Sequence, residues 1–171
     1  IPNYPIQISY PSNFSFSPFH LINDDGVAYT FGETESQSVI SGAGSQNYVS
    51  SWLVTQVRSA NSDDVINYSY QSGGSQYLTE RQWVSSLIYD SVPASGGHFT
   101  NSTSSTPTYT VVSTTIGQRN PHKITYTNGE VEFIQSNAGE RLDLINSHYL
   151  KQINVYNYEN GVKVLIKVIK F

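Results

Sequence analysis

Three dipeptides typical of tight β-hairpin turns constrain the fold of this chain more than any other feature. They are Asp25-Gly26, Asn128-Gly129 and Asn160-Gly161, and each separates two segments in which apolar and polar residues alternate. Type I′ turns require positive φ at both central residues, which Asn, Asp and Gly tolerate best. The pattern therefore predicts an antiparallel sheet built from hairpins.

The turn expected at Asn128-Gly129 predicts a register for its hairpin. A two-residue loop at this point places alternate side chains of the two strands on the same face of the sheet. The apolar face would hold the opposed pairs Tyr126–Val131 and Ile124–Phe133. The opposite face, expected to be solvated, would hold Lys123, Thr125, Glu130 and Glu132.

Equivalent loops predict the other hairpins. Asp25-Gly26 would pair Ile22 with Tyr29 and His20 with Phe31. The pairs predicted around Asn160-Gly161 are Tyr156–Leu165, Val155–Ile166, Ile153–Val168, Gln152–Ile169 and Leu150–Phe171. A fourth hairpin, over residues 51–59 and 65–70, has a connection without glycine, so its register stays undefined.

Three other segments complete a single β domain over residues 1–171. Residues 33–47 contain a Ser-Gly-Ala-Gly-Ser run and predict a flexible loop. Residues 93–107 are of low complexity and predict a flexible insertion. Residues 77–91 fit either a strand or a short helix, because Thr79 and Gln82 would form a capping box. The expected fold is all-β: an antiparallel, hairpin-rich sheet, a curled or sandwich-like meander, with at most one short helix.

Composition supports extended structure and narrows the function. Charged residues make up 13% of the chain, about half the usual share, and aromatic residues another 13%. This combination excludes a coiled coil and a disordered chain. A net charge of −4 disfavours a nucleic-acid partner. No apolar run reaches the about 18 residues that a transmembrane segment needs.

Several segments resemble a known bacterial family. They are residues 25–32 (DGVAYTFG), 52–57 (WLVTQV) leading to 66–70 (INYSY), and 124–133 (ITYTNGEVEF). Together they are similar to the β-hairpin region ahead of the repeats in wall-associated or secreted Rhs/YD-repeat proteins. The chain departs from the repeats themselves, because its only Tyr-Asp pair, Tyr89-Asp90, is not followed by glycine. The resemblance implies a secreted or surface-displayed sheet within a larger shell or stalk, with no catalytic residues.

The residues that could carry chemistry have structural explanations. The four histidines, His20, His98, His122 and His148, are not at metal-ligand spacing from one another. The chain has no cysteine and no Gly-x-Ser-x-Gly nucleophile elbow. We therefore predict that the protein is not an enzyme and has no catalytic residue, metal site or cofactor.

Two tryptophans are the candidate binding residues. Trp52 and Trp83 could stack on sugar rings, as aromatic residues do in carbohydrate-binding β-sandwich modules. Alternatively, tryptophan and tyrosine serve here as strand-forming residues with large buried areas. Sugar binding is therefore the alternative to a purely structural role.

The strand expected at residues 162–171 is apolar on both faces, although it contains Lys163, Lys167 and Lys170. A long apolar edge recruits other strands. We therefore expect the chain to be an excised part of a longer β-array, whose next strand pairs with this edge. The sequence thus predicts a non-catalytic structural or interaction module. Its partners would be the rest of the parent polypeptide, and a glycan or another protein.

Overall fold

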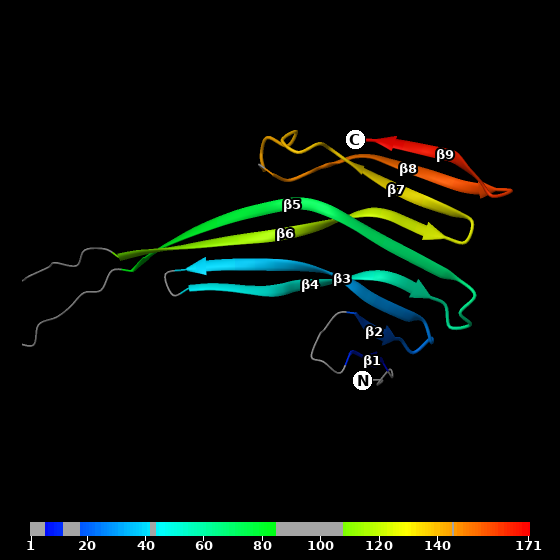
Figure 1. The fold of residues 1–171 in the computed structure, drawn as a ribbon, viewed down its shortest axis with the longest axis horizontal. Helices are drawn as coiled ribbons and strands as arrows, with labels where there is room; N and C mark the ends of the chain where they lie inside the picture. The colour runs from blue at the N-terminus through cyan, green and yellow to red at the C-terminus, as the bar shows by residue number, and fades with distance from the viewer. Residues whose placement is uncertain (1–5, 12–17, 42–43, 85–107, 145) are drawn as a thin grey trace, which may run out of the picture.

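The computed structural model describes residues 6–11, 18–41, 44–84, 108–144 and 146–171. Within these ranges the protein forms nine β-strands and no helix (Figure 1). The strands are β1 (Gln7–Ser9), β2 (Phe19–Ile22), β3 (Ala28–Ser41), β4 (Gly44–Arg58), β5 (Val65–Val84), β6 (Thr108–Tyr126), β7 (Gly129–Gln135), β8 (Leu150–Glu159) and β9 (Val162–Lys170). The prediction of an all-β fold is confirmed.

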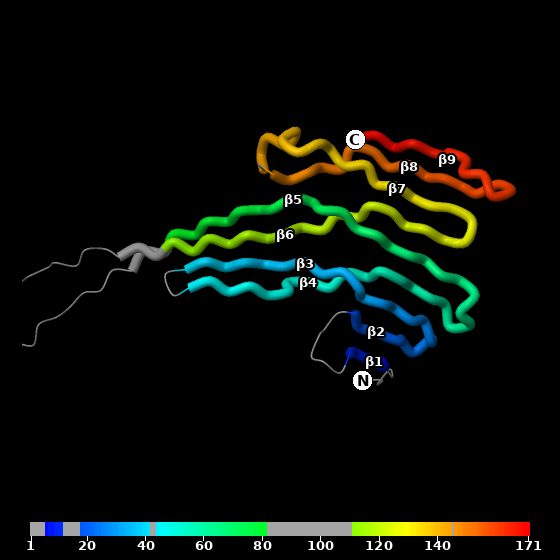
Figure 2. Tube along the Cα trace, viewed as in Figure 1, coloured from blue at the N-terminus to red at the C-terminus, as the bar shows by residue number. Residues whose placement is uncertain are grey.

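Consecutive strands pair antiparallel from β1 to β9, which confirms the hairpin-rich meander. The two longest hairpins, β3–β4 and β5–β6, run side by side (Figure 2). At one end β4 pairs with β5, but only over residues 56–58 and 65–67. At the other end β3 pairs with β6, over residues 36–40 and 113–117. The strands that join the two hairpins therefore change along their length, from β4–β5 at one end to β3–β6 at the other. Bulges in β3 and β5 accompany this change.

The register gives the meander an apolar and a polar face. We define the apolar face by two runs of residues that oppose one another in neighbouring strands, and by a shorter third row of the same kind. The runs are Ile8–Leu21–Tyr29–Val57–Ile66 and Tyr68–Ile124–Val131–Val155, and the third row is Phe133–Ile153–Ile169. We define the polar face by the run Ser9–His20–Thr30–Gln56–Asn67–Thr125–Glu130–Tyr156.

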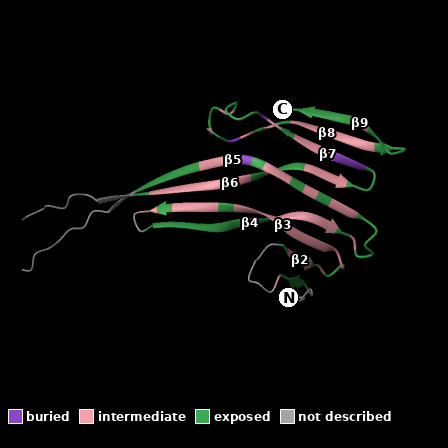
Figure 3. Cartoon of the chain, in the orientation of Figure 1, coloured by how far each residue is buried: buried purple, intermediate pink, exposed green. Residues whose placement is uncertain are grey.

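The sheet does not enclose a hydrophobic core within the described residues. None of their hydrophobic side chains is buried, and the buried polar residues are Glu130, Ser136 and Ser147. Figure 3 shows half-buried and exposed residues along almost all of the strands. Burial is therefore greatest at polar groups, the reverse of an ordinary globular domain.

The hairpin at Asn128-Gly129 has the predicted faces but not the predicted pairs. Its loop lies one residue earlier, so Ile124 opposes Val131 and Tyr126 opposes Gly129. Gly129 is not among the residues with positive φ; it belongs to β7, and an added Cβ would lie 2.5 Å from the Tyr156 carbonyl oxygen. Close contact, rather than turn conformation, therefore requires this glycine. The expectation that Glu130 is solvated is also wrong, because only 3% of it is exposed.

The register predicted around Asp25-Gly26 is wrong by one residue. The Asn23 N–H donates to the Val27 carbonyl at 3.1 Å, and the Gly26 N–H donates to the Asn23 carbonyl at 3.0 Å. With Gly26 at φ +80°, this is a three-residue loop with a bulge rather than a two-residue turn. His20 therefore opposes Thr30 and not Phe31, and Phe31 opposes Phe19.

The type I′ turn predicted at Asn160-Gly161 is supported by φ values of 52° and 79°. The nearby pair Tyr156–Leu165 is confirmed. Further along, a bulge leaves Ile166 without an opposed residue in β8. The predicted pairs beyond that point are therefore wrong, and the structure has Val155–Lys167, Asn154–Val168, Ile153–Ile169 and Gln152–Lys170.

The loop predicted over residues 33–47 is wrong, since residues 33–41 and 44–47 belong to β3 and β4. These strands alternate small polar residues with few large ones, and β3 pairs here with β6 as well as with β4. The predicted hairpin of residues 51–59 and 65–70 is confirmed in outline. Residues 77–84 adopt the strand alternative. Residues 85–91 and the insertion at 93–107 lie outside the described residues.

Candidate functional site

The apolar face is the largest candidate interaction surface. It crosses nine strands, which at about 4.8 Å between neighbouring strands makes it about 40 Å wide. Its central side chains, such as Val131 and Val155, are half-buried by their neighbours in the sheet. Its ends are open: Ile8 is 59% exposed and Ile169 36%. Lys167 is the charged residue opposite Val155, so charge enters this face at the β9 end.

Aromatic rings gather on β2, β3 and β4. The rings of Phe19 and Phe31 stack with centroids 4.4 Å apart, and Trp52 meets Phe19 edge-on at 6.3 Å. Trp52 is 37% exposed, so its ring both packs and reaches solvent. Trp83 lies in β5 opposite Tyr109, and its side chain is outside the described part of the structure. The structure therefore does not bring the two tryptophans into one described platform.

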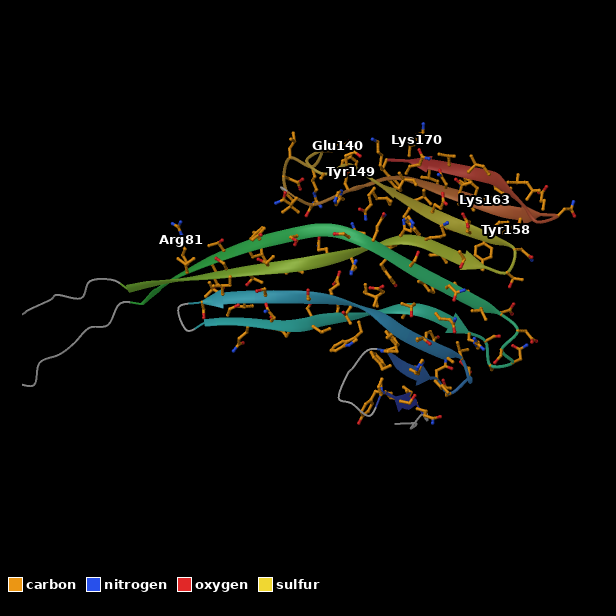
Figure 4. The ribbon with its side chains drawn as sticks, viewed as in Figure 1. Arg81, Glu140, Tyr149, Tyr158, Lys163 and Lys170 are labelled. Carbon is orange, nitrogen blue, oxygen red and sulfur yellow. The ribbon has the colours of Figure 1, made fainter. Side chains whose placement is uncertain are left out.

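A charge cluster lies on the polar face where β6, β7, β8 and β9 meet. The Lys163 ammonium contacts both Glu130 and Glu132, at 2.8 Å from Glu132 Oε1. Lys123 lies 3.5 Å from Glu130 Oε1 and 3.3 Å from Glu132 Oε1. Tyr158 donates its hydroxyl to Glu130 Oε2 at 2.7 Å. Tyr158 and Lys163 occupy the β8–β9 end of the sheet in Figure 4.

The cluster is electrostatically self-contained. The hydrogen bond from Lys163 lowers the pKa of the Glu132 carboxyl to about 2, despite partial burial. Burial raises the pKa of Glu130, but the contacts with Lys163 and Tyr158 outweigh it, so the net shift is downward. Both carboxylates are therefore ionised near neutral pH and paired with two lysines. This arrangement stabilises the sheet and is unsuited to general acid catalysis, which needs a raised carboxyl pKa.

A hollow of about 500 Å³ opens beside β6, where β7 departs from it. We call it the β6 hollow. It lies next to residues 118–122, which separate the part of β6 that pairs with β3 from the part that pairs with β7. Its lining residues are Gln71, Ser72, His122, Phe133, Ile134, Gln135, Ser136, Asn137, Ala138 and His148.

The chain between β7 and β8 is held against β5 by backbone contacts. The His148 N–H donates to the Gly73 carbonyl at 3.2 Å, and the Ser75 N–H donates to the Asn146 carbonyl at 3.2 Å. Gly74 has φ +94°, and a Cβ there would overlap the Asn146 carbonyl oxygen. These contacts place His148 at the hollow with His122, although the two residues are far apart in the sequence.

Sequence reasoning missed this hollow because its members come from β5, β6, β7 and the connection after β7. The two histidines were visible as candidate residues, but no sequence spacing relates them. The other two histidines are placed apart: His20 lies on the polar face with its Nδ1 3.1 Å from Thr30 Oγ1, and His98 lies outside the described residues. Within the described ranges, no three residues of types His, Cys, Asp or Glu form a metal-binding group.

In the parts of the chain that the structure describes, no helix has the length and apolar character needed to cross a bilayer. Comparison of the chain with protein-family models, curated proteins and solved structures gives no match. The resemblance to Rhs/YD-repeat proteins therefore stays a prediction from sequence.

Proposed function

We propose that this protein is a non-catalytic structural and interaction module whose apolar face packs against another protein layer. The single observation that carries the proposal is an apolar face crossing nine strands while none of the described hydrophobic side chains is buried. A sheet with one apolar face is ordinarily covered by a second layer. Large exposed apolar patches rimmed by polar residues mark sites of association.

The resemblance to Rhs/YD-repeat proteins supports a more specific form of the proposal. In that form the module belongs to a large secreted or surface-displayed bacterial protein, and the covering layer is part of that protein's shell. The outer edge of β9, which pairs with no further strand in the described part of the chain, supports the same role, because Ile166 is 58% exposed and unpaired with β8. A strand or loop of the covering layer would reduce this exposure.

The test uses two opposite changes on the two faces of one sheet. Val131→Thr with Val155→Thr replaces apolar groups on the apolar face with side chains of similar shape. Thr125→Val makes the reverse change on the polar face and serves as the matched control. We expect the wild-type chain to bind the dye ANS and to associate with increasing concentration in sedimentation velocity experiments. The double variant should bind less ANS and associate more weakly, whereas the control should behave as the wild type.

A wild-type chain that stays monomeric and binds no ANS would contradict the proposal. The non-catalytic part has its own test, a screen against glycoside, ester and peptide substrates, in which we expect no turnover. Turnover that disappears when His20, His122 or Glu132 is replaced would overturn it. The alternative function, a carbohydrate-binding module, is favoured by the partly exposed ring of Trp52 and predicts sugar binding that Trp52→Ala abolishes.

A further inference from the structure

The β6 hollow differs chemically from the rest of the sheet, and the inference drawn from it does not depend on the proposed function. None of its ten lining residues is Asp, Glu, Lys or Arg. The charge cluster, by contrast, gathers Lys123, Lys163, Glu130 and Glu132 on the same sheet. An ionised ligand would find no Asp, Glu, Lys or Arg in the lining to pair with it, and leaving a charge unpaired is costly. The hollow therefore suits a neutral ligand.

Several polar groups of the hollow have unused hydrogen-bonding capacity. His148 Nδ1 lies 2.8 Å from the Ser136 carbonyl oxygen, which can only accept, so this nitrogen carries a proton and donates it, and Nε2 is left for a ligand. Gln71 donates its amide Nε2 to the Phe133 carbonyl at 3.2 Å, which leaves its own oxygen as an acceptor. Within the described residues the His122 side chain makes no hydrogen bond. The Gln135 amide nitrogen is buried with no hydrogen-bond partner.

The lining therefore combines amide, hydroxyl and imidazole groups with one aromatic residue, Phe133. A volume of about 500 Å³ falls within the range of about 300–1,000 Å³ typical of small-molecule sites. A pyranose ring has hydroxyls that both donate and accept, and a C–H face that packs against an aromatic ring. Because the hollow is open to solvent, hydroxyls that find no protein partner stay hydrated.

We propose that the β6 hollow binds a neutral sugar residue. Phe133 supplies the apolar surface, and Gln71, His122 and His148 hydrogen-bond the hydroxyls. The site is distinct from the tryptophans singled out in the sequence. A phosphorylated or carboxylated ligand is disfavoured by a lining that contains no Lys or Arg.

The experiment measures binding of the methyl glycosides of glucose, galactose, mannose and N-acetylglucosamine to the full chain by saturation-transfer difference NMR. At least one glycoside should bind saturably. His122→Ala should weaken that binding about two- to tenfold, the equivalent of one hydrogen bond of about 0.5–1.5 kcal/mol. Gln71→Ala is the second variant, and circular dichroism checks that both variants keep the fold. His20→Ala, which removes a histidine from the polar face, is the matched control and should bind as the wild type.

Three outcomes would overturn the inference. The first is that none of the four glycosides binds. The second is that binding survives both His122→Ala and Gln71→Ala but is lost in Trp52→Ala, which would assign sugar binding to the tryptophan. The third is that glucuronic acid binds more tightly than every neutral glycoside, which would contradict the choice of a neutral ligand.

Discussion

Gly129 and Gly161 both follow an asparagine, yet the protein needs them for different reasons. Gly161 has φ +79°, and a Cβ built there meets no atom within 4 Å. Gly129 lacks positive φ, and a Cβ built there lies 2.5 Å from the Tyr156 carbonyl oxygen and 2.7 Å from the Tyr126 hydroxyl. The first glycine provides backbone conformation, and the second provides space.

Substitution by asparagine separates the two roles. Asparagine tolerates positive φ, so Gly161→Asn should change the free energy of unfolding by less than about 1 kcal/mol. Gly129→Asn forces a side chain into the β7–β8 backbone contact and should destabilise the protein by about 1–3 kcal/mol, the usual cost of overpacking. Urea unfolding of both variants checks the difference. Equal losses in the two variants would show that Gly129 is needed for its turn conformation after all.

The charge cluster predicts a loss of stability in acid. The pKa of Glu132 in the folded protein is about 2, below its ordinary value of 4.5, and that of Glu130 is lowered as well. The unfolded chain therefore binds these protons more readily than the folded one. The stabilisation that the two ionised carboxylates provide is complete above about pH 4.5 and is lost as the pH falls towards 2.

Thermal unfolding between pH 6 and pH 2, run at about one-unit steps, measures this effect. Below pH 4.5 the melting temperature of the wild type should fall more steeply than that of Glu132→Gln, which cannot titrate at this position. The comparison between the two proteins removes the contribution of all other carboxyl groups. Parallel curves for wild type and variant would contradict a lowered pKa for Glu132.

At the scale of single elements, β9 is an edge strand that is only partly protected. Among the described strands it pairs with β8 alone, and the bulge at Ile166 interrupts that pairing. Bulges and lysines are both devices that protect edge strands from pairing with other chains. Against this, Val162, Leu165 and Ile166 are each at least 50% exposed. The exposed apolar side chains make β9 the element most prone to association.

A lysine placed at the bulge should separate association from stability. Ile166→Lys alters an exposed, unpaired position, so the free energy of unfolding should change by no more than about 0.5 kcal/mol while self-association decreases. Val131→Lys introduces the same side chain at a half-buried position of the apolar face and should cost more stability. Sedimentation velocity and urea unfolding provide the two measurements. Undiminished association of Ile166→Lys would remove β9 from the interface.

At the scale of the whole molecule, stability comes from strand pairing and polar contacts more than from a closed core. The nine strands are linked by ladders that range from three residue pairs, in β1–β2 and β4–β5, to the longest, β5–β6. Yet none of the described hydrophobic side chains is buried: about half of them are half-buried, and the rest are exposed. Covering the apolar face would therefore add hydrophobic stabilisation that the described sheet lacks by itself.

This architecture predicts weakly cooperative unfolding. The denaturant dependence of the unfolding free energy scales with the surface newly exposed, and an open sheet exposes less new surface than a compact domain. The urea m-value of the monomeric chain should lie at or below the lower end of the about 1–3 kcal/mol/M range of small domains. An m-value near the top of that range would indicate that the apolar face is already covered in the monomer.

The local sequence was sufficient to predict an all-β chain, the hairpins at residues 25–26, 128–129 and 160–161, and the division of their strands into two faces. Alternation of apolar and polar residues is a property of each strand alone, and it places Ile124 with Val131 on one side and Thr125 with Glu130 on the other. The Asn-Gly pair at residues 160–161 likewise acts through its own backbone conformations. Such features survive in the structure because they depend on neighbouring residues only.

The tertiary structure decided the registers, the strand character of residues 33–47 and the position of the hollow. A loop one residue longer at Gly26 or a bulge at Ile166 shifts every later pair, and both depend on contacts across strands. The pairing of β3 with β6 joins residues more than 70 positions apart, at Ile40 and Ser113. The burial of Glu130 requires Lys163 and Tyr158 from other strands. These outcomes were beyond sequence reasoning because their energies arise between segments that only the folded sheet brings together.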